Sequence, residues 1–249
     1  MRLPGRREPR AAGCDHSVIK SHAVTTFPAT MTRQIVFGAA CWALSIAFFV
    51  NQAIVQAASA RPYSLATNYI SDLGNTACGS YSAGGYHADV CSPLHGLMNA
   101  TFIVVGLLHV LGAILTRRAW PRRLLTSSGL ALLALAGVGL ILAGFAPENV
   151  NLSLHSQGAL FGLDCLNVAM ILLGLGLLHV ARGLGAMALV AGLVGIVGSV
   201  LFMHSLAGLP VGTAERIADY PAAAMVVVLG AFLLGSSASA RARAPLATP

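Results

Sequence analysis

Residues 124–145 read LLTSSGLALLALAGVGLILAGF and contain no charged side chain. An α-helix needs about 20 consecutive, mostly apolar residues to span the hydrocarbon core of a bilayer. The apolar residues run continuously here, without the alternation that is typical of a membrane β-strand. The segment therefore predicts a membrane-spanning helix.

Further apolar stretches lie on both sides of this segment, near residues 35–58, 94–115, 157–180, 184–206 and 220–235. The last is the shortest, and its Pro221 suits a first helical turn, where the missing N–H costs nothing. Charged residues make up only 9% of the 249 residues, against about 25% in soluble domains. We therefore expect an all-α, six-helix transmembrane bundle that occupies residues 31–235.

Basic residues collect beside alternate ends of these stretches. Of the 15 Lys and Arg residues, 13 lie in the N-terminal segment, in the loops after the second and fourth stretches, and after the sixth. Only Arg61 and Arg216 lie in the other loops. Because short cytoplasmic loops are enriched in Lys and Arg, we predict cytoplasmic termini and a multi-pass protein of the cell membrane. The scattered clusters disfavour nucleic-acid binding and favour contact with anionic head groups of the lipid bilayer.

The two ends of the chain differ in composition from the apolar core. Residues 1–30 contain Arg and Pro and lack the apolar run of a secretory signal. They are either a disordered basic tail or residues ahead of the true start, because Met31 is an alternative start to Met1. Residues 236–249 are small and basic, and we predict a disordered tail there.

The longest loop, residues 59–93, is expected on the outer side of the membrane and contains Cys78 and Cys91. On the oxidising side of a membrane such a pair most often forms a disulfide. The alternatives are two free thiols, or a metal site that includes His87. We predict the disulfide.

Polar side chains recur at the predicted outer ends of the spans. His95 and Asn99 share a helical face, because they are four residues apart. Asp164 lies inside the fourth span, where an ionised carboxylate is costly unless it is paired or hydrated. We therefore expect Asp164 to form the floor of one polar site. The candidate residues of this outer-face site are Ser71, Asp72, Ser92, His95, Asn99, His155, Asp164, His204, Glu215 and Arg216.

These residues also allow other interpretations. The histidines could hydrogen-bond at the lipid interface, and Glu215 and Arg216 could form a solvated pair in the last outer loop. His95, His155, His204 and Asp164 could instead hold the metal of an intramembrane hydrolase around a water molecule. The sequence lacks a clear H-x3-H pair, so no metal site is predicted, and no cofactor is indicated.

Residues 68–74 read NYISDLG. Their second half resembles an S-x-L-G segment that follows the first span in a bacterial membrane family, catalogued only as domain of unknown function 998. Further points of resemblance are Ser92-Pro93 with Asn99, His155-x2-Gly158-Ala159, and Glu215-Arg216 ahead of the last span. The resemblance covers about residues 35–235 and implies a six-helix bundle, but no activity.

The sequence leaves three hypotheses about function open. The first is a membrane protein that binds or handles a small solute or a lipid at the outer-face polar site. The second is a structural or assembly protein without catalysis, and the third is the metal-dependent intramembrane hydrolase. The sequence identifies no substrate and no oligomeric state.

Overall fold

A computed structural model describes residues 31–204 and 208–243, except for the side chains of 237–243. The predictions for residues 1–30 lie outside these ranges. The helices are α1 (Arg33–Leu44), α2 (Ala47–Ala57), α3 (His95–Thr116), α4 (Leu124–Phe145), α5 (Leu152–Leu177), α6 (Arg182–His204) and α7 (Val211–Arg243). Two short 3-10 helices, η1 (Ser71–Gly74) and η2 (Arg117–Ala119), and two strands, β1 (Gly79–Ala83) and β2 (Tyr86–Val90), complete the described structure.

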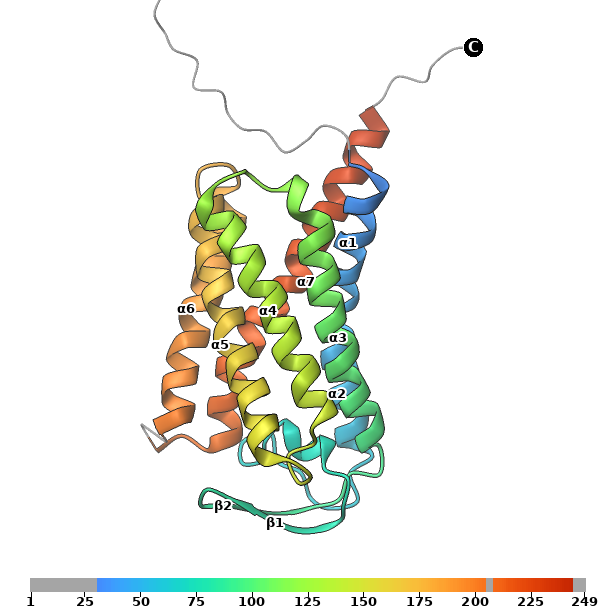
Figure 1. Cartoon of the computed structure of the whole chain (residues 1–249), viewed down its shortest axis with the longest axis vertical. Coiled ribbons are helices and arrows are strands. Elements are labelled where there is room, and N and C mark those ends of the chain that lie inside the picture. Colours follow the sequence, from blue (N-terminus) through green and yellow to red (C-terminus); the bar gives the residue numbers. More distant parts are fainter. Residues whose placement is uncertain (1–30, 205–207, 244–249) are drawn as a thin grey trace, which may run out of the picture.

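The helices form one bundle whose members run roughly along a common axis (Figure 1). Six of the described helical segments are long and apolar enough to cross a membrane, with α1 and α2 together counting as one. This confirms the predicted all-α, six-helix architecture. Successive spans pack side by side, and α7 closes the bundle by packing against α1. The start of α1 and the end of α7 lie at the same end of the bundle (Figure 1), whereas the side of the membrane that this end faces remains a prediction.

The helix of the first span is interrupted between α1, which ends at Leu44, and α2, which begins at Ala47. The hydroxyl of Ser45, at the end of α1, donates a 2.5 Å hydrogen bond to the carbonyl oxygen of Trp42. Serine side chains that bond back to the preceding turn compete with the helix ladder and often bend a helix. Ser45 and Phe48, at this interruption, both line a cavity inside the bundle.

Glycine and one buried amide bring the later helices close together. A Cβ atom on Gly139 in α4 would lie 2.6 Å from the carbonyl oxygen of Gly158 in α5, so only glycine permits this approach. Asn167 in α5 is fully buried and donates to the carbonyl oxygen of Ala218 in α7 at 3.0 Å and to Ser199 in α6 at 3.4 Å. These contacts join α5, α6 and α7 at the level of the membrane interior.

Helix α7 is longer at both ends than the predicted span. It begins at Val211 rather than near residue 220, so Glu215 and Arg216 lie in its first turns and not in a loop. Pro221 is inside the helix, as membrane helices tolerate when neighbouring groups satisfy the freed backbone. The helix also continues to Arg243, into the segment predicted to be a disordered tail, because its small and basic residues are adequate helix formers.

The loop of residues 59–93, hereafter the lid, covers one end of the bundle (Figure 1). Its strands β1 and β2 pair antiparallel, with Ala83 opposite Tyr86. Gly84 and Gly85 form the turn with φ values of 54° and 87°, as a tight hairpin turn of this kind requires. The hairpin was not predicted from the sequence.

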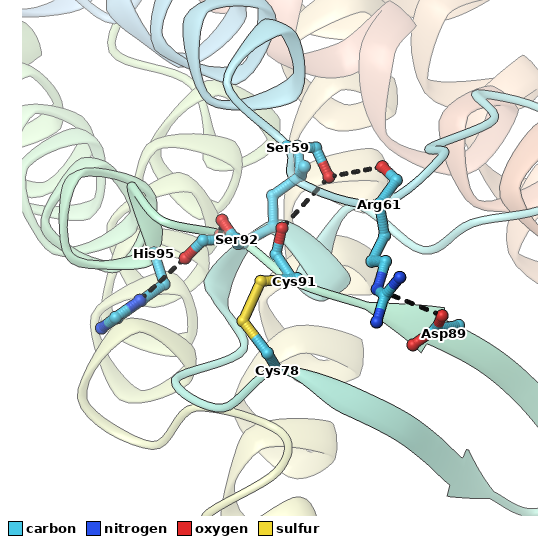
Figure 2. Close-up of a disulfide and its surroundings, with 8 residues drawn as sticks. Ser59, Arg61, Cys78, Asp89, Cys91, Ser92 and His95 are labelled. Atoms are coloured by element: carbon cyan, nitrogen blue, oxygen red, sulfur yellow. Dashed lines mark hydrogen bonds and ion pairs between the residues drawn. A yellow bond between two sulfur atoms is a disulfide. The ribbon is translucent and has the colours of Figure 1, made fainter.

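A disulfide closes the base of the hairpin and confirms the predicted pairing of Cys78 with Cys91, whose Cα atoms are 4.2 Å apart (Figure 2). On the same side of the lid, Arg61 and Asp89 form an exposed ion pair at 3.3 Å. The Ser59 hydroxyl bonds to the carbonyl oxygens of Arg61 and Cys91 (Figure 2). The lid is therefore a folded unit with its own covalent and polar links.

Candidate functional site

Asp72 organises the lid from its buried centre, where it is 2% exposed. Its Oδ2 accepts hydrogen bonds from the side-chain amide of Asn68 at 2.8 Å, from the backbone N–H of Tyr69 at 3.1 Å, and from the hydroxyl of Tyr86. The residues come from the two halves of the lid. Asp72 therefore joins η1 to the hairpin.

Glu148 links the lid to the α4–α5 loop. The hydroxyl of Ser71 donates a 2.8 Å hydrogen bond to Glu148 Oε2, and Glu148 is 4% exposed. Burial, and then the negative charge of the adjacent Asp72, raise the pKa of Glu148 to about 9. Two buried carboxyl groups this close to each other disfavour a second negative charge, so Glu148 keeps its proton. Glu148 is therefore neutral at pH 7.

The first turns of α7 hold the lid from the opposite side. Oε2 of Glu215 accepts a 2.6 Å hydrogen bond from the backbone N–H of Ile70. The guanidinium of Arg216 donates to the carbonyl oxygens of Asn68 and Gly212, each at 2.9 Å, and to the hydroxyl of Tyr63 at 2.5 Å. All of the hydrogen bonds that we observe for Arg216 therefore go to uncharged acceptors.

The start of α3 holds the same segment of the lid through backbone contacts. Ser92 donates from its hydroxyl to the carbonyl oxygen of Leu73 at 2.7 Å. Asn99 donates from its amide to the carbonyl oxygen of Gly74 at 2.8 Å. His95 Nδ1 donates to the carbonyl oxygen of Ser92 at 2.9 Å (Figure 2). Ser92 and Asn99 therefore hold η1 over the bundle, and His95 bonds to the backbone of Ser92.

A cavity of about 80 Å³ lies inside the bundle, directly beneath Ile70 and Ser71 of the lid. Helices α2, α3, α4, α5 and α7 contribute to its wall, together with Ser45 at the junction of α1 and α2. The apolar part is formed by Phe48, Ile70, Phe102, Val105, Ala136, Leu140, Ala143, Ala159, Gly162, Leu163, Leu166 and Ala223. The polar part is formed by Ser45, Ser71, His109, His155, Glu215 and Asp219.

Two carboxylates dominate the polar wall. Glu215 and Asp219 are four residues apart on α7 and therefore share one helical face. Among the described residues, no Lys, Arg or His lies within ion-pair distance of either carboxylate, and Asp219 receives no hydrogen bond. The positive charge of Arg216 acts on both carboxylates, but from beyond ion-pair distance.

His155 adds an acceptor to the same wall. Its Nδ1 lies 3.1 Å from the carbonyl oxygen of Ala143 and 2.9 Å from that of Ala146. Carbonyl oxygens only accept hydrogen bonds, so Nδ1 must carry the ring proton, which leaves Nε2 of the neutral ring as an acceptor. The arrangement provides acceptors and negative charge to an occupant, but no charged donor.

Aromatic rings form the wall beside the carboxylates. Phe48 and Phe102 both line the cavity, with their ring centroids 6.3 Å apart. The face of an aromatic ring attracts a cation electrostatically within about 6 Å of its centroid. Carboxylates and aromatic faces in one cavity favour a positively charged occupant with an apolar part.

The structure brings most, but not all, of the predicted site residues together around the lid and the cavity. Asp164 is half-buried on α5, does not line the cavity, and has no hydrogen-bond partner among the described residues. His204 is exposed at the end of α6, next to residues that the structure does not describe. The outer-face set therefore separates into a group at the lid and these two residues.

A metal site does not form from these residues. In the described ranges, no group of three or more His, Cys, Asp or Glu side chains is placed to hold a metal ion. His95 and His155 instead bond to backbone carbonyl oxygens. The four ligands of the hydrolase hypothesis are thus not assembled.

Glu148, Asp219 and His109 were absent from the sequence-derived set. The spacing of Glu215, Asp219 and Ala223 places them on one face of a continuous helix, and all three line the cavity. This four-residue spacing could have identified Asp219 from the sequence. It was missed because the last span was predicted to begin near residue 220, which left Glu215 and Asp219 outside the helix.

Comparison with known proteins gives the family but no activity. No curated protein and no solved structure matches the chain. Residues 38–232 match the family described as "Protein of unknown function (DUF998)". The match covers the lid, the cavity, the four middle spans and most of the first and last spans. The chain is therefore a multi-pass membrane protein that belongs to the DUF998 family.

Proposed function

We propose that this protein binds a small organic ammonium ion in the cavity beneath the lid, as part of the handling of a small amine at the membrane. One observation carries the proposal. Glu215 and Asp219 open together into an otherwise largely apolar cavity, and among the described residues no basic side chain contacts either of them, since Arg216 acts on both only from beyond ion-pair distance.

Charge is the first support for this proposal. Ionisable side chains inside a membrane span are costly unless they are paired or hydrated. An ammonium ion would bring a positive charge into direct contact with the carboxylates and donate to Glu215, to Asp219 and to Nε2 of His155. Its carbon atoms would lie against Phe48 and Phe102, where cation–π attraction adds to apolar contact.

Size is the second support. The cavity of about 80 Å³ is smaller than an engineered cavity of about 150 Å³ that binds benzene. Methylammonium and slightly larger alkylammonium ions fit this volume, whereas a phospholipid does not. A bare alkali ion suits the site less well, because a largely apolar wall cannot replace the oxygen atoms of its hydration shell.

The lid contacts indicate how such a solute would enter. Ile70 and Ser71 form the roof of the cavity, and each is bonded to an acid, Glu215 and Glu148 respectively. Entry from this end of the bundle would require these bonds to open and then to reform. We infer that occupancy of the cavity and closure of the lid are coupled.

The test is isothermal titration calorimetry, in which purified protein in detergent is titrated with methylammonium chloride at constant ionic strength. Sodium chloride and tetramethylammonium chloride are the comparison salts. The proposal expects saturable binding of methylammonium and weaker or no binding of sodium. Equal heats for all three salts would contradict it and would favour the structural or assembly hypothesis.

A further inference from the structure

We propose a second site, at the end of the bundle opposite the lid, where a groove between α3 and α4 binds one anionic phospholipid. The groove has a volume of about 540 Å³. Its lining consists of Ala113, Ile114, Arg117, Arg118, Pro121, Arg122, Thr126, Ser127, Leu130, Ala131 and Ala134. The lipid phosphate would contact the arginines, and one acyl chain would lie along the apolar residues.

The rim of this groove carries positive charge without a counter-charge. Arg117, Arg118 and Arg122 are exposed and line the groove. Within the described ranges none of them forms an ion pair. The acids of those ranges lie in the lid, in the α4–α5 loop, on α5 and at the start of α7. An anion at the rim therefore meets several arginines and no competing carboxylate.

The start of α4 adds backbone donors beside the arginines. Helix α4 begins at Leu124, its N-cap residue Arg123 makes no side-chain capping bond, and its first turn contains no acid. The first N–H groups of a helix have no partner within the helix and, with the helix dipole, favour an anion. Thr126 and Ser127 of the same turns line the groove.

The floor of the groove explains why the anion would be a lipid. Below the arginines the lining is apolar, and Ala113, Ala131 and Ala134 are small enough to leave a channel between the helices. Ile114 is 53% exposed beside them. These residues belong to membrane-spanning segments, so an acyl chain reaches them directly from the bilayer. A free phosphate ion would use the rim alone.

Native mass spectrometry of detergent-solubilised protein tests this site. The protein is titrated with phosphatidylglycerol and with phosphatidylcholine that has the same acyl chains. We expect one phosphatidylglycerol to bind at least tenfold more tightly than phosphatidylcholine. Replacing Arg117, Arg118 and Arg122 with Gln should remove this preference, at roughly fivefold in affinity for each arginine. Arg182→Gln, which removes an exposed arginine from the start of α6, is the control and should retain the preference.

A second variant separates the lipid from free phosphate. Ala131→Phe fills the apolar floor and leaves every arginine in place. It should weaken phosphatidylglycerol binding about tenfold and leave the weak binding of inorganic phosphate unchanged. Equal binding of both lipids by the natural protein would overturn the proposal. So would an Ala131→Phe variant with unchanged lipid affinity, because the occupant would then be a phosphate ion at the rim.

Discussion

The backbone N–H of Ile70 and the carboxylate of Glu215 are joined by a 2.6 Å hydrogen bond, although the residues are 145 positions apart in the sequence. Ile70 belongs to the roof of the cavity and Glu215 to its acidic wall. One carboxylate therefore both faces the proposed ammonium ion and holds the lid closed. Because of this double role, binding of an ammonium ion at Glu215 should change how readily the lid opens.

Methylammonium should slow hydrogen exchange of the backbone amides around Ile70. An occupied cavity favours the closed lid, and exchange of a bonded amide requires the bond to open. Exchange mass spectrometry of peptides from residues 68–74 measures the effect. The amides between β1 and β2 serve as the internal control, because the hairpin is bonded within itself. Faster exchange around Ile70 on addition of the ligand would show that binding opens the lid instead.

The raised pKa of Glu148 predicts a loss of stability at alkaline pH. Because the pKa of Glu148 is raised to about 9 in the folded protein, the folded state keeps a proton that the unfolded state releases above its ordinary pKa of 4.5. Stability from this group therefore falls as the pH rises from about 4.5 through about 9. Glu215 lies near Glu148 and belongs to the same cluster. Tyr69 also belongs to it, and burial raises the pKa of the Tyr69 hydroxyl to about 12.

Glu148→Gln tests this cause directly, because the amide cannot ionise but can still hydrogen-bond to Ser71 and Asp72. The melting temperature of the natural protein in detergent should fall between pH 7 and pH 10, and that of the variant should fall much less. Asp89→Asn, at an exposed position of the hairpin, is the control and should behave like the natural protein. Parallel curves for all three proteins would show that Glu148 is not the titrating group.

The disulfide predicts a specific sensitivity of the lid to reduction. Cys78 and Cys91 are 13 residues apart, and closing a loop of about 15 residues stabilises a fold by roughly 3 kcal/mol in the chain-entropy model. Dithiothreitol should lower the melting temperature of the natural protein. The Cys78→Ser, Cys91→Ser double variant should melt at the same lower temperature, with or without the reductant. A double variant that still responds to dithiothreitol would place the sensitive thiols elsewhere.

The sequence was sufficient for the number of spans and for the disulfide, because each depends on a local or compositional signal, but it placed the start of the last span too late. A run such as residues 124–145 must cross the bilayer as a helix whatever its neighbours are. The site could not be assembled in the same way. Asp164 was expected at its floor because a buried acid needs partners, but depth alone does not tell which side of a helix faces the cavity. Glu148 in the α4–α5 loop lies close to Asp72 in the lid. A contact between two loops leaves no periodic pattern in the sequence, so it could not be predicted.

The orientation in the membrane follows from the distribution of basic residues and can be measured by labelling. Single cysteines placed in a variant without native cysteines would be treated with a membrane-impermeant thiol reagent in intact cells. A cysteine at Gly84, in the hairpin turn, should react. A cysteine at Arg122, in the arginine-rich loop at the opposite end, should be protected until the membrane is permeabilised. The reverse pattern would invert the predicted topology.

The most direct test of the proposed ammonium site is the effect of Asp219→Asn on methylammonium binding, measured by isothermal titration calorimetry. The substitution keeps the size of the side chain and removes one of the two carboxyl groups of the cavity. Asp164→Asn is the matched control, because Asp164 is a half-buried acid in a membrane-spanning helix that does not line the cavity. We predict that Asp219→Asn weakens binding at least tenfold with an unchanged melting profile, and that Asp164→Asn binds like the natural protein. Equal affinity in the Asp219→Asn variant and the natural protein, or a loss only in Asp164→Asn, would contradict the account.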